Sequence, residues 1–334
     1  MVSRVIPGGL VLAELLGRSN ILAIVTRQEP YRIQLWDDVA EACVTRVEPE
    51  ISAITAIRIN QDILLCALKD RVRLYNISDD LDLVAEYRTG DNDSGLVELS
   101  TGPQYITIFP GQRQGHLQIL QLGPKSDNAT RLADSRRNVI IAAHAAQLIC
   151  IAMSSDGLLV ATASKTGTLI RVWSAIDGQQ LIELRRGIDK VNIQSMSFST
   201  VTDSGQSKLA VVSDKATIHI FSVSKHDKAV QSMNGKSAFA VLASAGFTYL
   251  GSTWSTIQAR IHDTNFPQAE QIVRGSRRFV LGWSSGLVFV VLSHEGGLWK
   301  FVIASTPNQP ESYTCYQESY RSWKESLGIS EHEI

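Results

Sequence analysis

A short strand-like segment recurs along this chain, and its spacing limits the possible folds more than any other feature. The copies alternate apolar and polar residues, as half-buried β-strands do. The seven copies are residues 33–36, 72–75, 117–120, 170–173, 218–221, 258–261 and 298–301, and their starts are 39, 45, 53, 48, 40 and 40 residues apart. A period of roughly 40 to 45 residues is typical of four-stranded propeller blades. The sequence therefore predicts an all-β, seven-bladed WD40-type β-propeller.

Turn-forming residues stand directly before several of these copies. Segments 165–168 and 213–217 are rich in Lys, Asp, Thr and Gly, which favour tight hairpins. An apolar strand lies upstream of each hairpin, at residues 158–164 and 209–213. Two strands around a turn form the interior of a propeller blade, so we expect each hairpin to belong to one blade.

Composition and charge exclude several classes of protein. The net charge of −1 gives no general basic field for nucleic-acid binding, so an anion site must be local. The four cysteines lie far apart without zinc-ligand spacing, and we expect neither a metal nor a cofactor. No secretory signal is visible at the start, which predicts a cytoplasmic protein. Because no linker interrupts the chain, we expect one domain over residues 1–334, in which the polar segment 318–334 is either a short helix or a frayed, flexible tail.

The sharpest motif is Leu184-Arg185-Arg186-Gly187, which follows the fourth copy of the strand. Adjacent residues of an extended strand point to opposite faces, so each arginine would serve its own pocket. A guanidinium group binds phosphate oxygens in a bidentate manner, and Gly187 would let the backbone turn away without a Cβ clash. The alternative is an ordinary pair of solvated arginines on a strand surface.

The surroundings of this motif favour the phosphate interpretation. Residues 154–187, SSDGLLVATASKTGTLIRVWSAIDGQQLIELRRG, resemble the PROPPIN family, the WD-repeat proteins that interact with phosphoinositides. The resemblance extends from residues 18–23 through 91–96 to the strand ending at Phe301. It implies a seven-bladed propeller that binds phosphatidylinositol 3-phosphate and the 3,5-bisphosphate in two rim pockets. It also implies a role in autophagy and endolysosomal membrane traffic.

The resemblance further implies which residues form the two pockets. Phosphoinositide site 1 would contain His144, Thr162, Ser164, Gly167, Thr168, Arg171 and Arg185. Phosphoinositide site 2 would contain Arg186, Gly187, Ser213, Thr217 and His219. Hydroxyl groups would donate to inositol oxygens, Arg171 would add a second charge, and His219 would donate best when protonated. For each residue taken singly, the alternative is an ordinary turn or strand position.

Residues 224–252 form the longest excursion after a predicted core strand. In the PROPPIN family the matching loop enters the bilayer, where basic residues and apolar tips both favour attachment. The predicted membrane-contact residues are Lys225, Lys228, Met233, Lys236 and Phe239. The alternative is a plain connection that leads into the next strand.

The family resemblance also suggests partners and a location. Relatives recruit the lipid-transfer protein of the autophagy machinery near their second and third blades, where this chain has residues 69–73 and 87–93. Residues 25–31 lack a glycine- and proline-rich insertion found in several relatives, which leaves the partner's identity open. We expect a monomer without nucleic-acid partners that attaches peripherally to preautophagosomal, endosomal, or vacuolar and lysosomal membranes.

Two other functions compete with phosphoinositide binding. The sequence contains no Gly-x-Ser-x-Gly elbow, Walker loop, Rossmann fingerprint or metal-ligand spacing, so we do not expect an enzyme. A WD-repeat protein-interaction scaffold without lipid binding remains the alternative, because propeller rim loops vary freely. The matching sets of hydroxyl and basic residues on both sides of the arginine pair favour lipid binding.

Overall fold

The computed structural model describes most of the chain as β-strands. The described residues are 6–47, 50–77, 81–102, 105–122, 137–200, 206–224, 253–261, 278–294, 296–306 and 309–322. Every regular element among them is a strand, as the alternating pattern predicted. Within these residues no helix is long and apolar enough to cross a membrane.

Contacts along the chain define two compact units, residues 2–148 and 149–334. Each unit is described here by its own sheets. One domain over residues 1–334 therefore stays a prediction.

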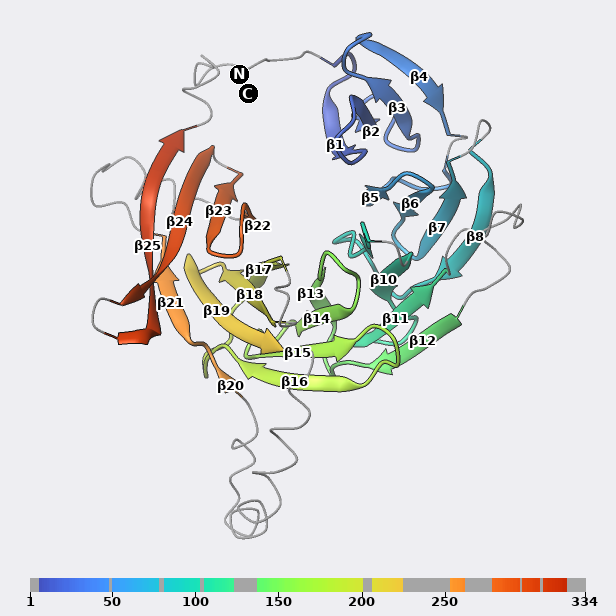
Figure 1. The fold of residues 1–334 in the computed structure, drawn as a ribbon. Helices are drawn as coiled ribbons and strands as arrows, with labels where there is room; N and C mark the ends of the chain where they lie inside the picture. Colours follow the sequence, from blue (N-terminus) through green and yellow to red (C-terminus); the bar gives the residue numbers. More distant parts are fainter. Residues whose placement is uncertain are drawn as a thin grey trace. The chain divides into compact units, whose positions relative to one another are not determined.

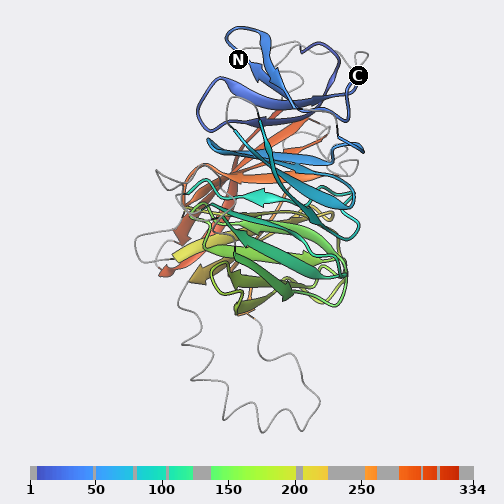
Figure 2. The same cartoon turned by 90° about the vertical axis from the view of Figure 1, so that its right-hand side faces the viewer.

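The N-terminal unit contains three four-stranded sheets, in each of which sequential strands pair side by side (Figure 1 and Figure 2). The first sheet consists of β1 (Leu10–Leu15), β2 (Ile21–Thr26), β3 (Gln34–Asp37) and β4 (Ala42–Arg46). The second consists of β5 (Ala56–Ile59), β6 (Ile63–Ala67), β7 (Arg71–Asn76) and β8 (Leu83–Arg88). The third consists of β9 (Glu98–Leu99), β10 (Ile106–Pro110), β11 (His116–Gln121) and β12 (Arg137–Ala142).

The C-terminal unit contains the remaining three sheets (Figure 1). The fourth sheet has five strands in the order β13 (Leu148–Met153), β14 (Leu159–Ser164), β15 (Leu169–Ser174), β16 (Gln180–Arg185) and β20 (Thr253–Trp254). The fifth consists of β17 (Ile193–Phe198), β18 (Gln206–Ser213), β19 (Thr217–Ser224) and β21 (Ile257–Arg260). The sixth consists of β22 (Phe279–Trp283), β23 (Val288–Ser293), β24 (Gly297–Thr306) and β25 (Gln309–Ser322).

One predicted repeat has a different place in the structure. Residues 258–261 were expected to be the core strand of a blade of their own, but β21 is the outer strand of the fifth sheet and pairs with β19. The other six predicted copies all lie in the third strand of their sheets. The described residues form six sheets, so a seventh blade stays a prediction.

Apolar residues of neighbouring sheets build the core of the C-terminal unit. Ala161 and Val172 of the fourth sheet belong to one buried cluster with Met196 and Val211 of the fifth. Strands β17 and β22 are also joined, because the Phe279 N–H donates to the Gln194 side-chain oxygen at 2.7 Å. Full burial of one aliphatic side chain, such as Val172 or Val211, contributes roughly 1.5–3 kcal/mol to the free energy of folding. This packing holds the fourth and fifth sheets together, where the arginine pair lies.

The first residues of the segment expected to be a C-terminal tail belong to a β-strand. Strand β25 runs to Ser322, which pairs with Gly297 of β24. The expectation of a tail starting at residue 318 is therefore wrong for residues 318–322, because the ladder to β24 continues through them. Residues 323–334 lie outside the described part of the chain.

Candidate functional site

Arg185 ends strand β16 and lies between two neighbouring strands. It pairs with Leu169 of β15 on one side and with Trp254 of β20 on the other. Only 6% of Arg185 is exposed, and its guanidinium carbon lies 5.7 Å from the centroid of the Trp254 ring. This distance is that of a cation–π contact. The indole therefore covers the first arginine of the pair.

Arg186 has different partners, as expected for the next residue of an extended strand. Its backbone N–H donates to the Thr168 carbonyl at 3.0 Å, which prolongs the pairing of β16 with β15. Its guanidinium Nε donates to the Gly167 carbonyl at 3.2 Å, and Nη2 donates to the Asp189 carbonyl. Burial lowers the pKa of Arg186, but an arginine stays protonated in proteins. A buried positive charge is thus fixed between two turns.

Arg186 lies in the wall of a cavity with a volume of about 920 Å³. Four residues predicted for site 2 line this cavity: Arg186, Gly187, Thr217 and His219. The other lining residues are Ile188, Asp189, Lys215, Trp254, Gln258, Ala259, Arg260, Phe301, Cys315 and Gln317. Burial raises the pKa of Cys315 to about 12, so its thiol adds no negative charge. Among the described lining residues, three cationic side chains thus accompany a single carboxylate.

Ser213 and Gly187 depart from what the sequence suggested for site 2. Ser213 is 1% exposed and does not line the cavity, and its hydroxyl has no hydrogen-bond partner among the described residues. A Cβ at Gly187 would meet open space, so the expectation that a side chain there would clash is wrong. The missing side chain instead leaves the cavity wall open next to Arg186.

His219 lies in the cavity wall as a neutral side chain. It is 4% exposed, and its Nδ1 lies 3.2 Å from the Ser255 hydroxyl. Burial, with a smaller contribution from the charge of Arg186, lowers the pKa of His219 to about 4. Near neutral pH the imidazole is therefore uncharged and carries one N–H only, so it can donate one hydrogen bond and accept another.

The predicted residues of site 1 make contacts within the fourth sheet. Arg171 donates from Nε to the Glu183 carboxylate at 2.9 Å, directly across the ladder. The fully buried Thr162 hydroxyl accepts a hydrogen bond of 2.9 Å from the Trp173 indole. These contacts favour the structural interpretation for Thr162. They also leave Arg171 sharing its charge with a neighbouring acid.

The hairpin between β14 and β15 supports the arginine pair through its backbone. Gly167 has a φ of +63°, and a Cβ there would lie 1.9 Å from the Val191 carbonyl oxygen. Gly167 and Thr168, both predicted for site 1, offer their carbonyls to Arg186 of site 2. The Ser164 hydroxyl lies 3.0 Å from the hydroxyl of Thr166 in the same turn.

His144 lies in the N-terminal unit, whereas the other predicted residues of site 1 lie in the C-terminal unit. It is 8% exposed, and its backbone N–H donates to the Gly115 carbonyl at 3.0 Å. Its place in site 1 stays a prediction.

Sequence reasoning missed three side chains of the cavity. Arg260 lies in the segment that was assigned to a separate blade, and Lys215 was noted only as a turn residue. Trp254 follows the long excursion and reaches the arginine pair through the parallel pairing of β20 with β16. The sequence did contain one indication of Arg260: in a strand, Gln258 and Arg260 are two residues apart, so both polar side chains lie on the same face.

The predicted membrane-contact residues Lys225, Lys228, Met233, Lys236 and Phe239 lie outside the described residues. The excursion that contains them connects β19 to β20. Trp254, which follows this excursion in the sequence, pairs with Arg185 of β16.

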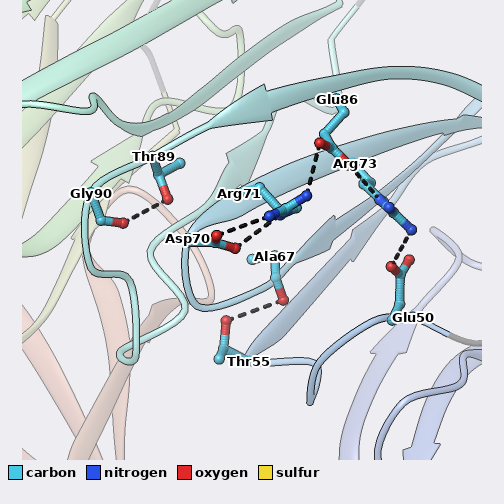
Figure 3. A network of polar contacts seen from close by, with 9 residues as sticks. All are labelled: Glu50, Thr55, Ala67, Asp70, Arg71, Arg73, Glu86, Thr89 and Gly90. Atoms are coloured by element: carbon cyan, nitrogen blue, oxygen red, sulfur yellow. Dashed lines mark hydrogen bonds and ion pairs between the residues drawn. The ribbon is translucent and has the colours of Figure 1, made fainter.

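The basic run at residues 69–73, expected to face a protein partner, is part of an ion-pair network in the N-terminal unit (Figure 3). Arg71 lies 3.0 Å from Glu86, and Arg73 lies 2.8 Å from the same carboxylate. Arg73 also lies 2.6 Å from Glu50, whose side chain is 1% exposed. The charges of Arg71 and Arg73 are thus balanced by neighbouring acids.

Comparison with known proteins gives consistent matches. A family model described as PROPPIN matches residues 2–279. SVP1-like protein 2 of Pichia angusta is 31% identical over 328 residues, which cover 95% of this chain and 84% of that protein. Autophagy-related protein 18e of Arabidopsis thaliana is 30% identical over 223 residues, which cover 64% of this chain and 54% of that protein.

Solved structures agree with the fold. Hsv2 of Kluyveromyces lactis matches with a TM-score of 0.75 at 22% identity, covering 96% of this chain and 89% of that chain. KlAtg21, solved in complex with the coiled coil of AgAtg16, matches with a TM-score of 0.64 at 20% identity, covering 93% of this chain and 84% of that chain. The predicted β-propeller fold is confirmed by these matches, and the number of blades stays a prediction.

Proposed function

Because this chain belongs to the PROPPIN family of autophagy-related β-propellers, we propose that it is a peripheral membrane protein that binds phosphatidylinositol 3-phosphate and 3,5-bisphosphate. The observation that carries this proposal is the cavity beside Arg186. Arg186, Lys215 and Arg260 line it, and Asp189 is the one acid among the described lining residues. In a chain with a net charge of −1, such a local excess of positive charge suits an anionic ligand.

The size and polarity of the cavity fit a phosphorylated inositol ring. Its volume of about 920 Å³ lies in the range of small-molecule sites. The cationic side chains would bind phosphate oxygens, and Arg186 is fixed in advance by its hydrogen bonds to backbone carbonyls. Thr217, Gln258 and the neutral His219 would exchange hydrogen bonds with the inositol hydroxyls.

We propose that Arg185 contributes a second, weaker headgroup contact on the fourth sheet. Its guanidinium is covered by Trp254, and the nearby Arg171 is paired with Glu183, so less positive charge is available there. Two weak contacts on one surface still strengthen attachment, because the second forms at the high effective concentration that the first creates.

Liposome flotation tests the proposal. The wild-type protein should float with phosphatidylcholine vesicles that contain phosphatidylinositol 3-phosphate. The double variant Arg185→Thr, Arg186→Thr should stay at the bottom of the gradient, and each single variant should retain partial binding.

A second double variant separates binding from folding. Lys215 and Arg260 are exposed, so Lys215→Ala with Arg260→Ala should leave the fold intact and weaken flotation. A loss of roughly 1 kcal/mol for each charge corresponds to about fivefold in affinity. The matched control is Arg278→Ala, an exposed cation that does not line the cavity. Unchanged flotation of both double variants would refute the proposal, and a wild type that never floats would favour the protein-only scaffold.

We also propose an autophagy protein as partner and preautophagosomal, endosomal, or vacuolar and lysosomal membranes as the location. A lipid-transfer protein would bind the second and third sheets. Arg71 pairs with Glu86, and Lys69, whose side chain is 64% exposed, pairs with Asp93. A pull-down should therefore compare Arg71→Glu and Lys69→Glu with the wild type, and equal recovery of the partner from all three would contradict this surface.

A further inference from the structure

Two apolar side chains at the edge of the Arg186 cavity are exposed to solvent. Ile188 is 82% exposed and Trp254 is 53% exposed, and both line the cavity. They come from distant parts of the sequence, because Ile188 follows β16 whereas Trp254 lies in β20. A single exposed apolar residue needs no explanation. Two of them beside one cationic cavity suggest a common apolar partner.

We propose that Ile188 and Trp254 form a membrane wedge that enters the interfacial region of an anionic bilayer when the cavity takes up a lipid headgroup. This wedge rests on the proposed function and adds to it an attachment point separate from residues 225–252. The headgroup of a membrane lipid lies at the level where tryptophan side chains prefer to reside. A cavity that binds the headgroup therefore brings its apolar border to the bilayer surface.

The charges around the wedge favour a lipid surface over an apolar protein groove. Arg186, Lys215 and Arg260 line the same cavity, and Lys190 is exposed two residues beyond Ile188. Basic residues beside apolar tips are attracted to anionic membranes, where both kinds of side chain gain free energy. Among the described residues that line the cavity, Asp189 is the one acid beside three basic side chains, so positive charge is in excess there.

The two side chains are positioned differently. Ile188 follows Gly187, and its side chain is open to solvent because 82% of the residue is exposed. Trp254 is held against the Arg185 guanidinium at 5.7 Å and is hydrogen-bonded through its backbone pairing with β16. Replacement of Ile188 therefore changes only exposed surface, whereas replacement of Trp254 also uncovers Arg185.

Ile188→Ser is the cleaner variant for a test. Its matched control is Ile176→Ser, since Ile176 is 40% exposed and lies in the turn before β16, whereas Ile188 lies just after that strand. Each protein should be titrated with phosphatidylcholine vesicles that contain phosphatidylinositol 3-phosphate, and separately with soluble inositol 1,3-bisphosphate. The second ligand has the same headgroup chemistry and no bilayer.

We expect Ile188→Ser to bind vesicles about tenfold more weakly, the loss that follows from an aliphatic side chain no longer buried in the interface. Its affinity for inositol 1,3-bisphosphate should change by less than about twofold, since the wedge meets lipid only. Ile176→Ser should match the wild type with both ligands. As a second readout, vesicles with brominated lipids should quench tryptophan emission of the wild type more than that of Trp254→Phe.

The outcomes separate the wedge from the proposed function. Wild-type binding to vesicles together with unchanged vesicle binding of Ile188→Ser would overturn the wedge alone, and the apolar pair would then be a protein-docking surface. Equal losses for vesicles and for inositol 1,3-bisphosphate would also overturn it, because Ile188 would then shape the cavity itself. A wild type that binds neither ligand would overturn both proposals.

Discussion

The guanidinium Nε of Arg186 donates to the carbonyl oxygen of Gly167 over 3.2 Å. This hydrogen bond ties the end of β16 to the turn between β14 and β15. The sequence had suggested Gly167 for the pocket of Arg185 and had placed Arg186 in a separate pocket. The turn therefore supports the second site through its backbone, and the two predicted sites share structural elements.

Gly167→Ala should lower the stability of the protein. The residue has a φ of +63°, and an added Cβ would lie 1.9 Å from the Val191 carbonyl oxygen, a backbone atom that cannot move aside easily. We expect the free energy of unfolding, measured by urea denaturation, to fall by about 1–3 kcal/mol. Gly187→Ala is the matched control, because a Cβ there meets open space. Equal midpoints for the two variants would contradict the steric argument.

His219 should contribute to acid destabilisation of the fold. Its pKa is about 4 in the folded protein, compared with an ordinary value of 6.5. Between these pH values the unfolded chain binds the proton and the folded chain does not, so stability is complete above pH 6.5 and falls as the pH drops towards 4. The loss from this residue has an upper bound of about 3 kcal/mol.

Urea denaturation at a series of pH values would measure this contribution. His219→Asn keeps a polar atom near the position of Nδ1 and should flatten the stability curve between pH 6.5 and 4. His294→Asn, at an exposed position, should retain the wild-type curve. If the curves of wild type and His219→Asn run parallel over this range, the neutral histidine is not a source of pH dependence.

The positions of the strands could be predicted from the sequence, but the place of each strand within its sheet could be predicted only for some of them. Alternation of apolar and polar residues identified Ile170 and Ile218 in β15 and β19, both third strands of their sheets. The same alternation at Gln258 cannot distinguish a third strand from a fourth, since both are half buried. The long excursion before Trp254 separates β19 from β21 by about one repeat length in the sequence, so β21 had the spacing expected for a new blade although it belongs to the same sheet as β19.

Part of the candidate site could be predicted from the sequence, because some of its residues stand in one local motif and others do not. Arg185 and Arg186 stand in a local motif, so their separation into different environments followed from strand geometry. Trp254 and Arg260 reach the same place through strand pairing across the long excursion, which no local pattern encodes. The neutral state of His219 depends on burial and on a neighbouring charge, and both are properties of the folded chain.

Glu50 should be important for the stability of the N-terminal unit. Its carboxylate is 1% exposed, lies 2.6 Å from Arg73 and accepts a hydrogen bond from the Tyr75 hydroxyl. Glu50→Gln would remove the buried one of the two acids that pair with Arg73 and the charged acceptor of the Tyr75 hydroxyl, leaving Glu86 as the remaining counter-charge of Arg73. Removal of one partner of a buried pair costs about 3 kcal/mol, and the pair with Glu86 makes this an upper bound. Urea denaturation should show a lower midpoint for this variant.

The exposed pair of Lys69 and Asp93 provides the control for Glu50. These side chains are 64% and 62% exposed and lie 3.3 Å apart. Exposed ion pairs contribute about 0–1 kcal/mol because water and salt screen them. Lys69→Ala should therefore leave the midpoint nearly unchanged. A midpoint for Glu50→Gln that is as high as that of Lys69→Ala would show that burial does not strengthen the Arg73 pair.

Arg186→Lys should weaken vesicle binding although it keeps the positive charge. The guanidinium of Arg186 donates to the Gly167 and Asp189 carbonyls from two different nitrogen atoms, which fixes its plane in the cavity wall. A lysine ammonium is a point charge on a flexible stem and cannot reproduce this fork. We expect about tenfold weaker flotation with vesicles that contain phosphatidylinositol 3-phosphate, roughly the 1.4 kcal/mol of one lost charge-assisted hydrogen bond.

The same exchange at Arg278, which is exposed and does not line the cavity, should leave flotation unchanged. Repeating the titration at several salt concentrations distinguishes charge from geometry. Both Arg186→Lys and the wild type carry the same charge, so their affinities should fall with a similar slope as salt screens the membrane. A steeper or shallower slope for Arg186→Lys, or wild-type affinity at every salt concentration, would mean that the fixed guanidinium plane is not what the headgroup recognises.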